Sequence, residues 1–149
     1  MKIKILILSM ITLLLMSCDM NDLFDKGDAE KVYDGPTVVG FFPLQQEVNL
    51  SAGAASVEIQ LIGAQRTAPL NVAFSVDGES TAQAGVHYNL VSSSPVSLPA
   101  NSSTVNVQIE LISGSLEAGQ SGLLILNLQG GDGVAASENL STARIFIRG

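Results

Sequence analysis

The sequence contains one cysteine, Cys18, and no tryptophan in 149 residues. A lone cysteine cannot form a disulfide within the chain, and a thiolate metal site needs several cysteines. Aromatic residues make up only 5% of the chain, as five phenylalanines and two tyrosines. So few rings do not supply the aromatic-lined cleft that stacks on sugar rings. A disulfide framework, a cysteine metal site and a deep glycan cleft are therefore not expected.

Positive charge is also scarce. Seven lysines and arginines face 14 aspartates and glutamates, which gives a formal net charge of −7. Binding to the phosphate backbone of nucleic acids requires a basic surface that releases counterions. Nucleic acid is therefore excluded as an expected partner.

Catalytic constellations are missing as well. His87 is the only histidine, and one histidine among many serines is no triad without a placed acid and an oxyanion hole. Glu117 and Asp132 could be imagined as the two carboxylates of a glycosidase, but no aromatic cleft accompanies them. We therefore expect a protein that is not an enzyme.

What the chain does have begins at its N-terminus. Lys2 and Lys4 precede an apolar stretch over residues 5–15, which is interrupted only by Ser9 and Thr12. A helix that spans a bilayer needs about 20 apolar residues, so this stretch is too short. A basic start followed by a short apolar run is typical of a secretory signal peptide, which we place at residues 1–17.

Cys18 ends the segment Leu15-Met16-Ser17-Cys18. This segment resembles the bacterial lipobox, in which an apolar residue and a small residue precede the modified cysteine. The resemblance implies that Cys18 becomes the first residue of the mature chain and carries acyl groups that anchor it in a membrane. A thiolate is the nucleophile that such acyl transfer requires, and more than one chain is needed for stable anchoring. With Cys18 acylated, core burial alone must hold the domain together.

Residues 18–36 carry many acids and few strand formers, which predicts a disordered tether behind the lipid. The acids resemble the export signal of surface lipoproteins in Gram-negative glycan-degrading bacteria. An aspartate directly after the cysteine instead resembles the inner-membrane retention signal of enteric-type bacteria. Because there are many acids, we favour an outer-membrane lipoprotein that faces the cell surface.

From residue 38 onward, polar and apolar residues alternate with period two, as in strands that bury one face. Strands are expected at Val38–Phe42 and at residues 57–61, 70–76, 88–91, 96–98, 103–111, 123–128 and 143–148. Breaks rich in Gly, Ser, Asn and Pro separate them. The spacing predicts an all-β domain over residues 37–149, a single Ig-like or Greek-key antiparallel β-sandwich of seven or eight strands.

Three segments of this domain carry a family resemblance. Residues 80–88, STAQAGVHY, the turn and strand that follow from residue 97, and residues 116–122, LEAGQSG, resemble the Calx-beta family. The resemblance covers about residues 38–148. Similar domains of unknown function occur in surface lipoproteins encoded beside glycan-uptake systems. The resemblance implies that this chain is one of these lipoproteins.

Calx-beta domains are known for calcium sites made of loop carboxylates, but this chain departs from that pattern. His87 stands where the family has an aspartate, and Gln120 stands near an expected acid. Calcium takes six to eight oxygen ligands, with several carboxylates converging. The weak remaining candidates are Asp77, Glu79, Glu117 and Asp132. We therefore expect no cofactor, and dispersed surface charge is the simpler interpretation of these four acids.

The leading functional hypothesis is a lipid-anchored cell-envelope module without catalysis. Its partner would be another envelope protein or a glycan-uptake complex, or a glycan bound directly. The expected partner surface consists of apolar side chains that are out of phase with the core, namely Phe41, Leu123, Ile125 and Phe146. Two alternatives stay open: an adhesin or fibre subunit that exchanges Val38–Phe42 along a sheet edge, and a calcium-binding spacer.

Overall fold

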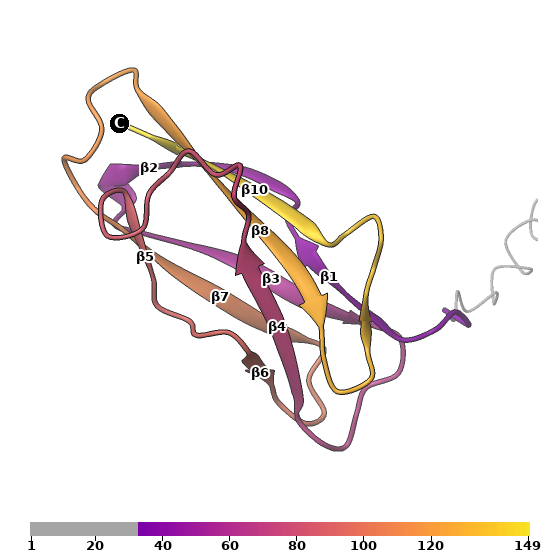
Figure 1. Ribbon diagram of the computed structural model, residues 1–149. Helices are drawn as coiled ribbons and strands as arrows, with labels where there is room; N and C mark the ends of the chain where they lie inside the picture. Colours follow the sequence, from indigo (N-terminus) through magenta and orange to yellow (C-terminus); the bar gives the residue numbers. More distant parts are fainter. Residues whose placement is uncertain (1–32) are drawn as a thin grey trace, which may run out of the picture. The chain divides into compact units, whose positions relative to one another are not determined.

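The structure, a computed structural model, describes residues 33–149. The signal peptide, Cys18 and residues 19–32 of the tether lie outside the described residues. The described chain forms two β-sheets packed face to face (Figure 1). Its only helical segment is the 3-10 turn Leu50–Ala52. No helix among the described residues is long and apolar enough to cross a membrane.

Each sheet has five strands. The first sheet has the order β5 (Tyr88–Leu90), β7 (Thr104–Leu111), β3 (Ala54–Ile62), β1 (Val38–Phe42) and β9 (Ala135–Ala136). The second sheet has the order β2 (Gln45–Asn49), β10 (Thr142–Arg148), β8 (Ser121–Gly130), β4 (Leu70–Val76) and β6 (Val96–Leu98). The predicted all-β sandwich is therefore confirmed, with ten strands in place of the seven or eight expected.

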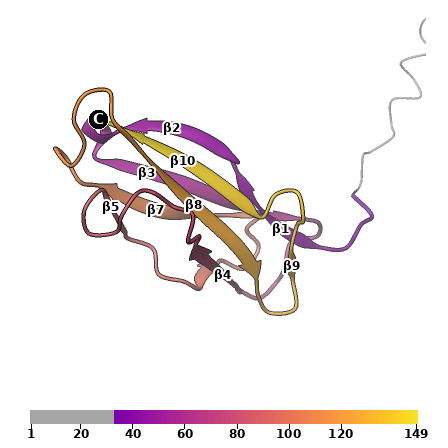
Figure 2. The same cartoon turned by 45° about the horizontal axis from the view of Figure 1, so that its top comes forward.

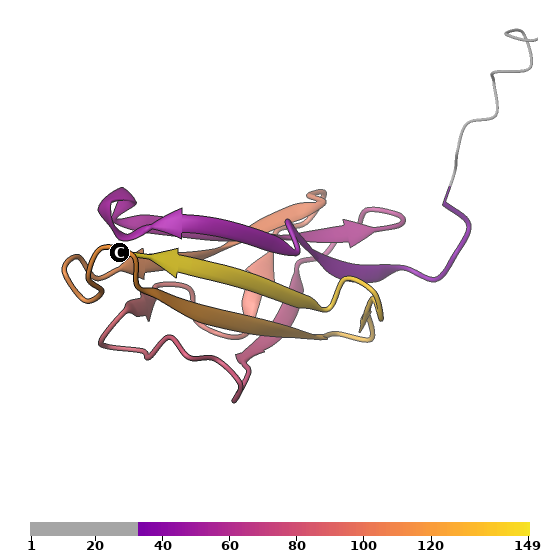
Figure 3. The same cartoon turned by 90° about the horizontal axis from the view of Figure 1, so that it is seen from above.

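The chain changes sheets between β1 and β2. β1 pairs antiparallel with β3, whereas β2 pairs parallel with β10 in the second sheet. Figure 3 shows β2 running beside β10 after the bend. Pro43 lies at this bend, and because proline has no N–H it cannot continue the ladder of β1. The parallel pairs β2–β10 and β1–β9 correct the expectation of a purely antiparallel sandwich.

Apolar side chains from both sheets fill the space between them. In β7, β8 and β10 every second residue is buried, as the period-two pattern predicts. β8 lies between β10 and β4 and is the central strand of the second sheet. The largest fully buried side chains in this core are those of Tyr88, Phe41, Ile59, Leu70, Leu98, Ile109, Leu124, Leu126, Ile145 and Ile147.

The turn after β8 brings two backbones close together. Figure 2 shows this turn at the end of β8, where the chain leads into β9. A Cβ atom on Gly131 would collide with the carbonyl oxygen of Asn71, the second residue of β4. Only glycine permits this approach, so steric hindrance requires a glycine at position 131 of the GGDG turn.

Candidate functional site

Leu123 and Phe146 lie side by side on the outer face of the second sheet. They are directly paired between β8 and β10, and Glu47 of β2 pairs with Phe146 on its other side. The chain neighbours of Leu123 and Phe146 are buried, and Val48 beside Glu47 packs against the core, so these three side chains point outward. Leu123 and Phe146 are both half-buried. The result is a cross-strand row, Glu47–Phe146–Leu123, with an apolar pair next to a carboxylate.

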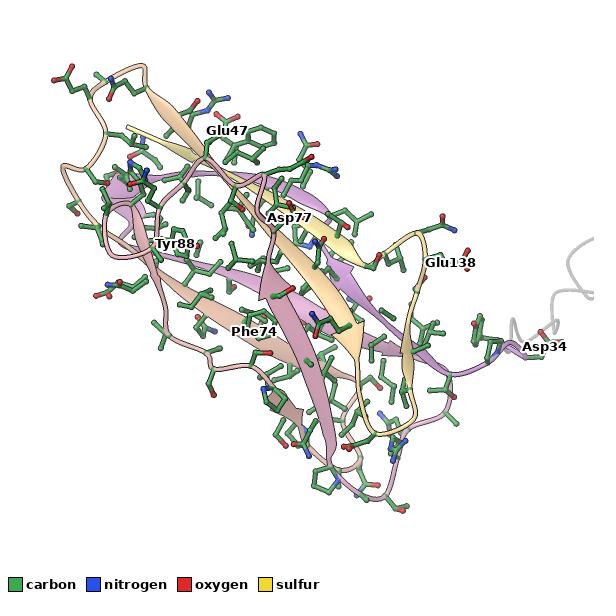
Figure 4. The ribbon with its side chains drawn as sticks, in the orientation of Figure 1. Asp34, Glu47, Phe74, Asp77, Tyr88 and Glu138 are labelled. Carbon is green, nitrogen blue, oxygen red and sulfur yellow. The ribbon has the colours of Figure 1, made fainter. Side chains whose placement is uncertain are left out.

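An ion pair lies beside this row. Nη2 of Arg148 donates a hydrogen bond to Oε2 of Glu47 at 2.9 Å, and Nε lies 2.9 Å from Oε1. The Nε contact is electrostatic, since its N–H is not aligned for a hydrogen bond. The hydrogen bond and the charge of Arg148 lower the pKa of Glu47 below its usual value. Figure 4 labels Glu47 on this face. Both side chains are exposed, so solvent screening leaves the pair little net contribution to stability.

Two members of the expected partner surface are buried. Phe41 is 1% exposed and belongs to the core, so its assignment to a partner surface was wrong. The strand β1 has the opposite phase to the one expected: Val39 and Phe41 face inward, and Phe42 faces outward with 60% of its surface exposed. Sequence reasoning missed Phe42, and the adjacent phenylalanines gave no signal to decide the phase.

Ile125 faces outward but is only 5% exposed, so it offers almost no contact area. It lies outside the core cluster. The segment that follows β4 runs along β8 here, and Ser80 Oγ accepts a hydrogen bond from the Ile125 N–H at 3.0 Å. Ile125 therefore drops out of the partner surface, and Leu123 and Phe146 are the two predicted residues that keep an outward, partly exposed position.

Asp77 is held by hydrogen bonds at the end of β4, where Figure 4 labels it. Its carboxylate accepts from the backbone N–H of Glu79 at 2.8 Å and from Nδ2 of Asn127. The Glu79 N–H and the Asn127 amide, with a smaller effect of the Arg144 charge, lower the pKa of Asp77. One carboxylate oxygen thus holds the turn and the other holds β8, which makes Asp77 a structural residue.

The other candidate calcium ligands lie elsewhere. Glu117 precedes β8 and Asp132 follows it, and ten residues of strand separate them by about 30 Å. Asp132 accepts a hydrogen bond from the N–H of Asn71 at 2.8 Å. Among residues 33–149 no three acids, histidines or cysteines lie close enough to hold a metal ion. The idea that these four acids converge is therefore wrong.

His87 and Tyr88 have structural roles. Nδ1 of His87 accepts a hydrogen bond from the N–H of Gln83 at 2.8 Å and closes the loop before β5. Tyr88 is 2% exposed, and burial raises the pKa of its hydroxyl. Because its ring is buried, Tyr88 is not available to stack on a sugar. Within residues 33–149, neither His87 nor Tyr88 forms a hydrogen bond or a strand pair with Glu47, Leu123 or Phe146.

The sequence matches no protein-family model, and no curated protein is significantly similar to it. Solved structures are similar in fold. The apo-form Calx CBD1 domain is 19% identical, with a TM-score of 0.62 over 76% of this chain and 97% of that one. The Calx CBD2 domain is 13% identical, with a TM-score of 0.56 over 78% and 90% of the two chains.

A Bacteroides ovatus protein of unknown function is also similar. It is 13% identical, with a TM-score of 0.51 over 74% of this chain and 45% of that one. The described domain therefore has a Calx-beta-like fold. Identities this low show the fold alone, so the function has to be argued from the residues of this chain.

Proposed function

We propose that this protein is a lipid-anchored, non-catalytic accessory module of the cell envelope. Its second sheet contacts another envelope protein, or a protein of a glycan-uptake complex, through the surface formed by Leu123 and Phe146. Cys18 anchors the chain in the outer membrane, and the acidic residues 19–36 hold the sandwich on the cell-surface side. No chemical step is assigned to the domain.

The observation that carries this proposal is the apolar pair on an outward face. Leu123 and Phe146 are paired between neighbouring strands and keep part of their surface accessible. The outer face of β3 and β7 in the first sheet instead presents mainly amides, hydroxyls and carboxylates, such as Glu58, Asn106 and Gln108. Apolar surface gathered on one face of a domain often marks a protein contact.

A photo-crosslinking amino acid tests the surface. Placed at position 146, it should give a discrete crosslinked species in whole cells, and the matched control at position 42 should not. Phe42 is the right control because it is an exposed aromatic residue of the first sheet. The Phe146→Asp variant should lose the partner crosslink from position 123 while its circular dichroism spectrum stays unchanged. A crosslink that forms equally at position 42, or that survives Phe146→Asp, contradicts the proposed surface.

The anchor needs its own experiment. Radiolabelled palmitate should be incorporated into the wild-type protein and not into Cys18→Ala, and intact-mass measurement should find the mature chain without residues 1–17. Protease added to whole cells should degrade the sandwich if it faces outward. Label that appears in Cys18→Ala, or a mature chain that retains residues 1–17, contradicts the anchor.

The two alternatives have less support. An exchanged β1 would have to be released from β3 on one side and from β9 and Leu140 on the other, so it is not a free edge. A calcium-binding spacer needs converging carboxylates, and Asp77, Glu117 and Asp132 are spread along the length of β8. One similar structure is described as a calcium binding domain, but the described part of this chain has no such cluster.

A further inference from the structure

One segment, residues 77–95, runs along an edge of both sheets, and we call it the edge strap. It leaves β4 in the second sheet, forms β5 in the first sheet and returns to β6 in the second sheet. Figure 1 shows it as the chain between the tip of β4 and β6. At three places where one strand stops pairing with its neighbour, serine or threonine hydroxyls of the edge strap accept N–H groups beyond the last pair.

Beyond the end of β4, two hydroxyls hold the exposed side of β8. β4 stops pairing with β8 at Val76. Oγ of Ser80 accepts the N–H of Ile125 at 3.0 Å and donates to the Ile125 carbonyl at 3.4 Å. Oγ1 of Thr81 accepts the N–H of Leu123 at 2.9 Å. The Ser80 hydroxyl thus bonds to both backbone groups of one residue, as a residue in a paired antiparallel strand does.

Three successive serines then connect the two sheets. Oγ of Ser92 accepts the N–H of Gln108 in β7, at 2.9 Å. Oγ of Ser94 accepts the N–H of Phe74 in β4, also at 2.9 Å. Within residues 33–149, the hydroxyl of Ser93 forms no hydrogen bond. Alternate serines therefore close the first sheet and the second sheet, and the serine between them does neither.

These edges lack the charges that often protect a strand edge. Lysine is the side chain most used for this protection, and residues 33–149 contain no lysine. Residues 80–95 contain no aspartate, glutamate or arginine either. The exposed side chains here include Val76, Val86 and Val91, and Val91 is 66% exposed. Because valine favours strands, an open N–H group beside it is suited to pair with another strand.

We propose that the edge strap keeps the domain monomeric. Its four hydroxyls occupy N–H groups of β4, β7 and β8 that would otherwise pair with a strand of a second copy of this chain. A second copy is the occupant because it presents the same open groups and the same exposed valines, and exposed edges of this kind pair with each other. A hydroxyl ends the ladder, since it has no backbone N–H and carbonyl on its far side. An added strand would only move the open edge outward.

Removal of two hydroxyls tests the edge strap in the full-length protein, kept in a detergent that is matched to the density of the buffer. Ser92→Ala/Ser94→Ala should exchange the N–H groups of Phe74 and Gln108 at least tenfold faster than wild type in dilute solution. At higher concentration, sedimentation velocity should show a dimer or a larger species, in which these two groups regain protection. The wild-type protein should stay monomeric over the same range.

Each other result overturns the proposal. Unchanged exchange at Phe74 and Gln108 means that the hydroxyls do not hold these N–H groups. Faster exchange without association at any concentration means that the open groups do not recruit a second copy. Association that leaves both groups unprotected means that the copies meet elsewhere. A wild-type protein that dimerises with these edges closed also refutes the role of the edge strap.

Ser93→Ala is the matched control, because it removes a hydroxyl from the same three serines without opening an N–H group. It should exchange and sediment as wild type does, and equal association of this variant refutes the proposal. Ser80→Ala/Thr81→Val tests the β8 edge independently and should give the same two effects at Leu123 and Ile125. If a double variant does not fold, as circular dichroism will show, Ser92→Ala and Thr81→Val apply the same test to one N–H group each.

Discussion

The adjacent residues Phe41 and Phe42 provide the sharpest test of the structure. Phe41 is 1% exposed and Phe42 is 60% exposed, although both belong to β1. Replacing Phe41 by alanine removes a ring from the space between the sheets, and such truncations lower the free energy of unfolding by about 3–5 kcal/mol. Replacing Phe42 removes mostly solvated surface, and the expected change is about 0.5 kcal/mol or less.

Urea denaturation, followed by circular dichroism, measures this difference. With a urea dependence of about 2 kcal/mol per M for a domain of this size, Phe41→Ala should lower the midpoint by roughly 2 M. Phe42→Ala should leave it nearly unchanged. Because native domains have only about 5–15 kcal/mol of stability, Phe41→Leu serves as a milder variant and should fall between the two. If Phe42→Ala is as destabilising as Phe41→Ala, the phase of β1 in this structure is wrong.

Three further predictions concern the turns and loops. Gly131→Ala should lower the free energy of unfolding by about 1–3 kcal/mol through overpacking, and so lower the urea midpoint, whereas the Cβ of Gly78→Ala meets no atom within 4 Å and should leave the midpoint unchanged; equal midpoints refute the close approach. The pKa of Asp77 is lowered from its ordinary 3.8, so its carboxylate stabilises the fold above that pH and stops doing so as the pH falls through the folded value. The stability difference between wild type and Asp77→Ala should therefore shrink below about pH 4, and a constant difference contradicts the assignment. Calcium at millimolar concentration should leave the melting temperature unchanged in differential scanning fluorimetry. A saturable rise in the melting temperature would contradict this prediction and show that the domain has a calcium site.

Most strands could be predicted because one face of each is buried. β1, β4 and β6 have the bounds that the alternation indicates. β2 could not be predicted, since QQEVN has one apolar residue in five and the neighbouring Pro43 marks an end to the ladder. Its place is decided by pairing with β10, almost 100 residues later in the chain. Local patterns contain no information on such a distant partner.

The partner surface was predicted only in part for a related reason. Alternation assigns Leu123 and Phe146 to an outer face, because β8 and β10 are long enough to fix the phase. Alternation cannot show that the chain after β4 runs along β8 and removes Ile125 from solvent. In β1, Val38, Gly40 and Phe42 fit a buried face as well as Val39 and Phe41 do. Exposure at these positions is a property of tertiary packing and could not be read from the sequence.

The loop carboxylates show how a Calx-beta-like sandwich can use acids without a metal. Asp77 accepts the N–H of Glu79, and Asp132 accepts the N–H of Asn71. Each acid thus satisfies a backbone donor near one end of β4, where the ladder cannot supply a partner. A carboxylate that already accepts a backbone hydrogen bond has little to offer a cation that needs six or more oxygens, and within residues 33–149 no three such ligands gather to hold one. The same sandwich therefore depends on its core and on side-chain hydrogen bonds at its turns.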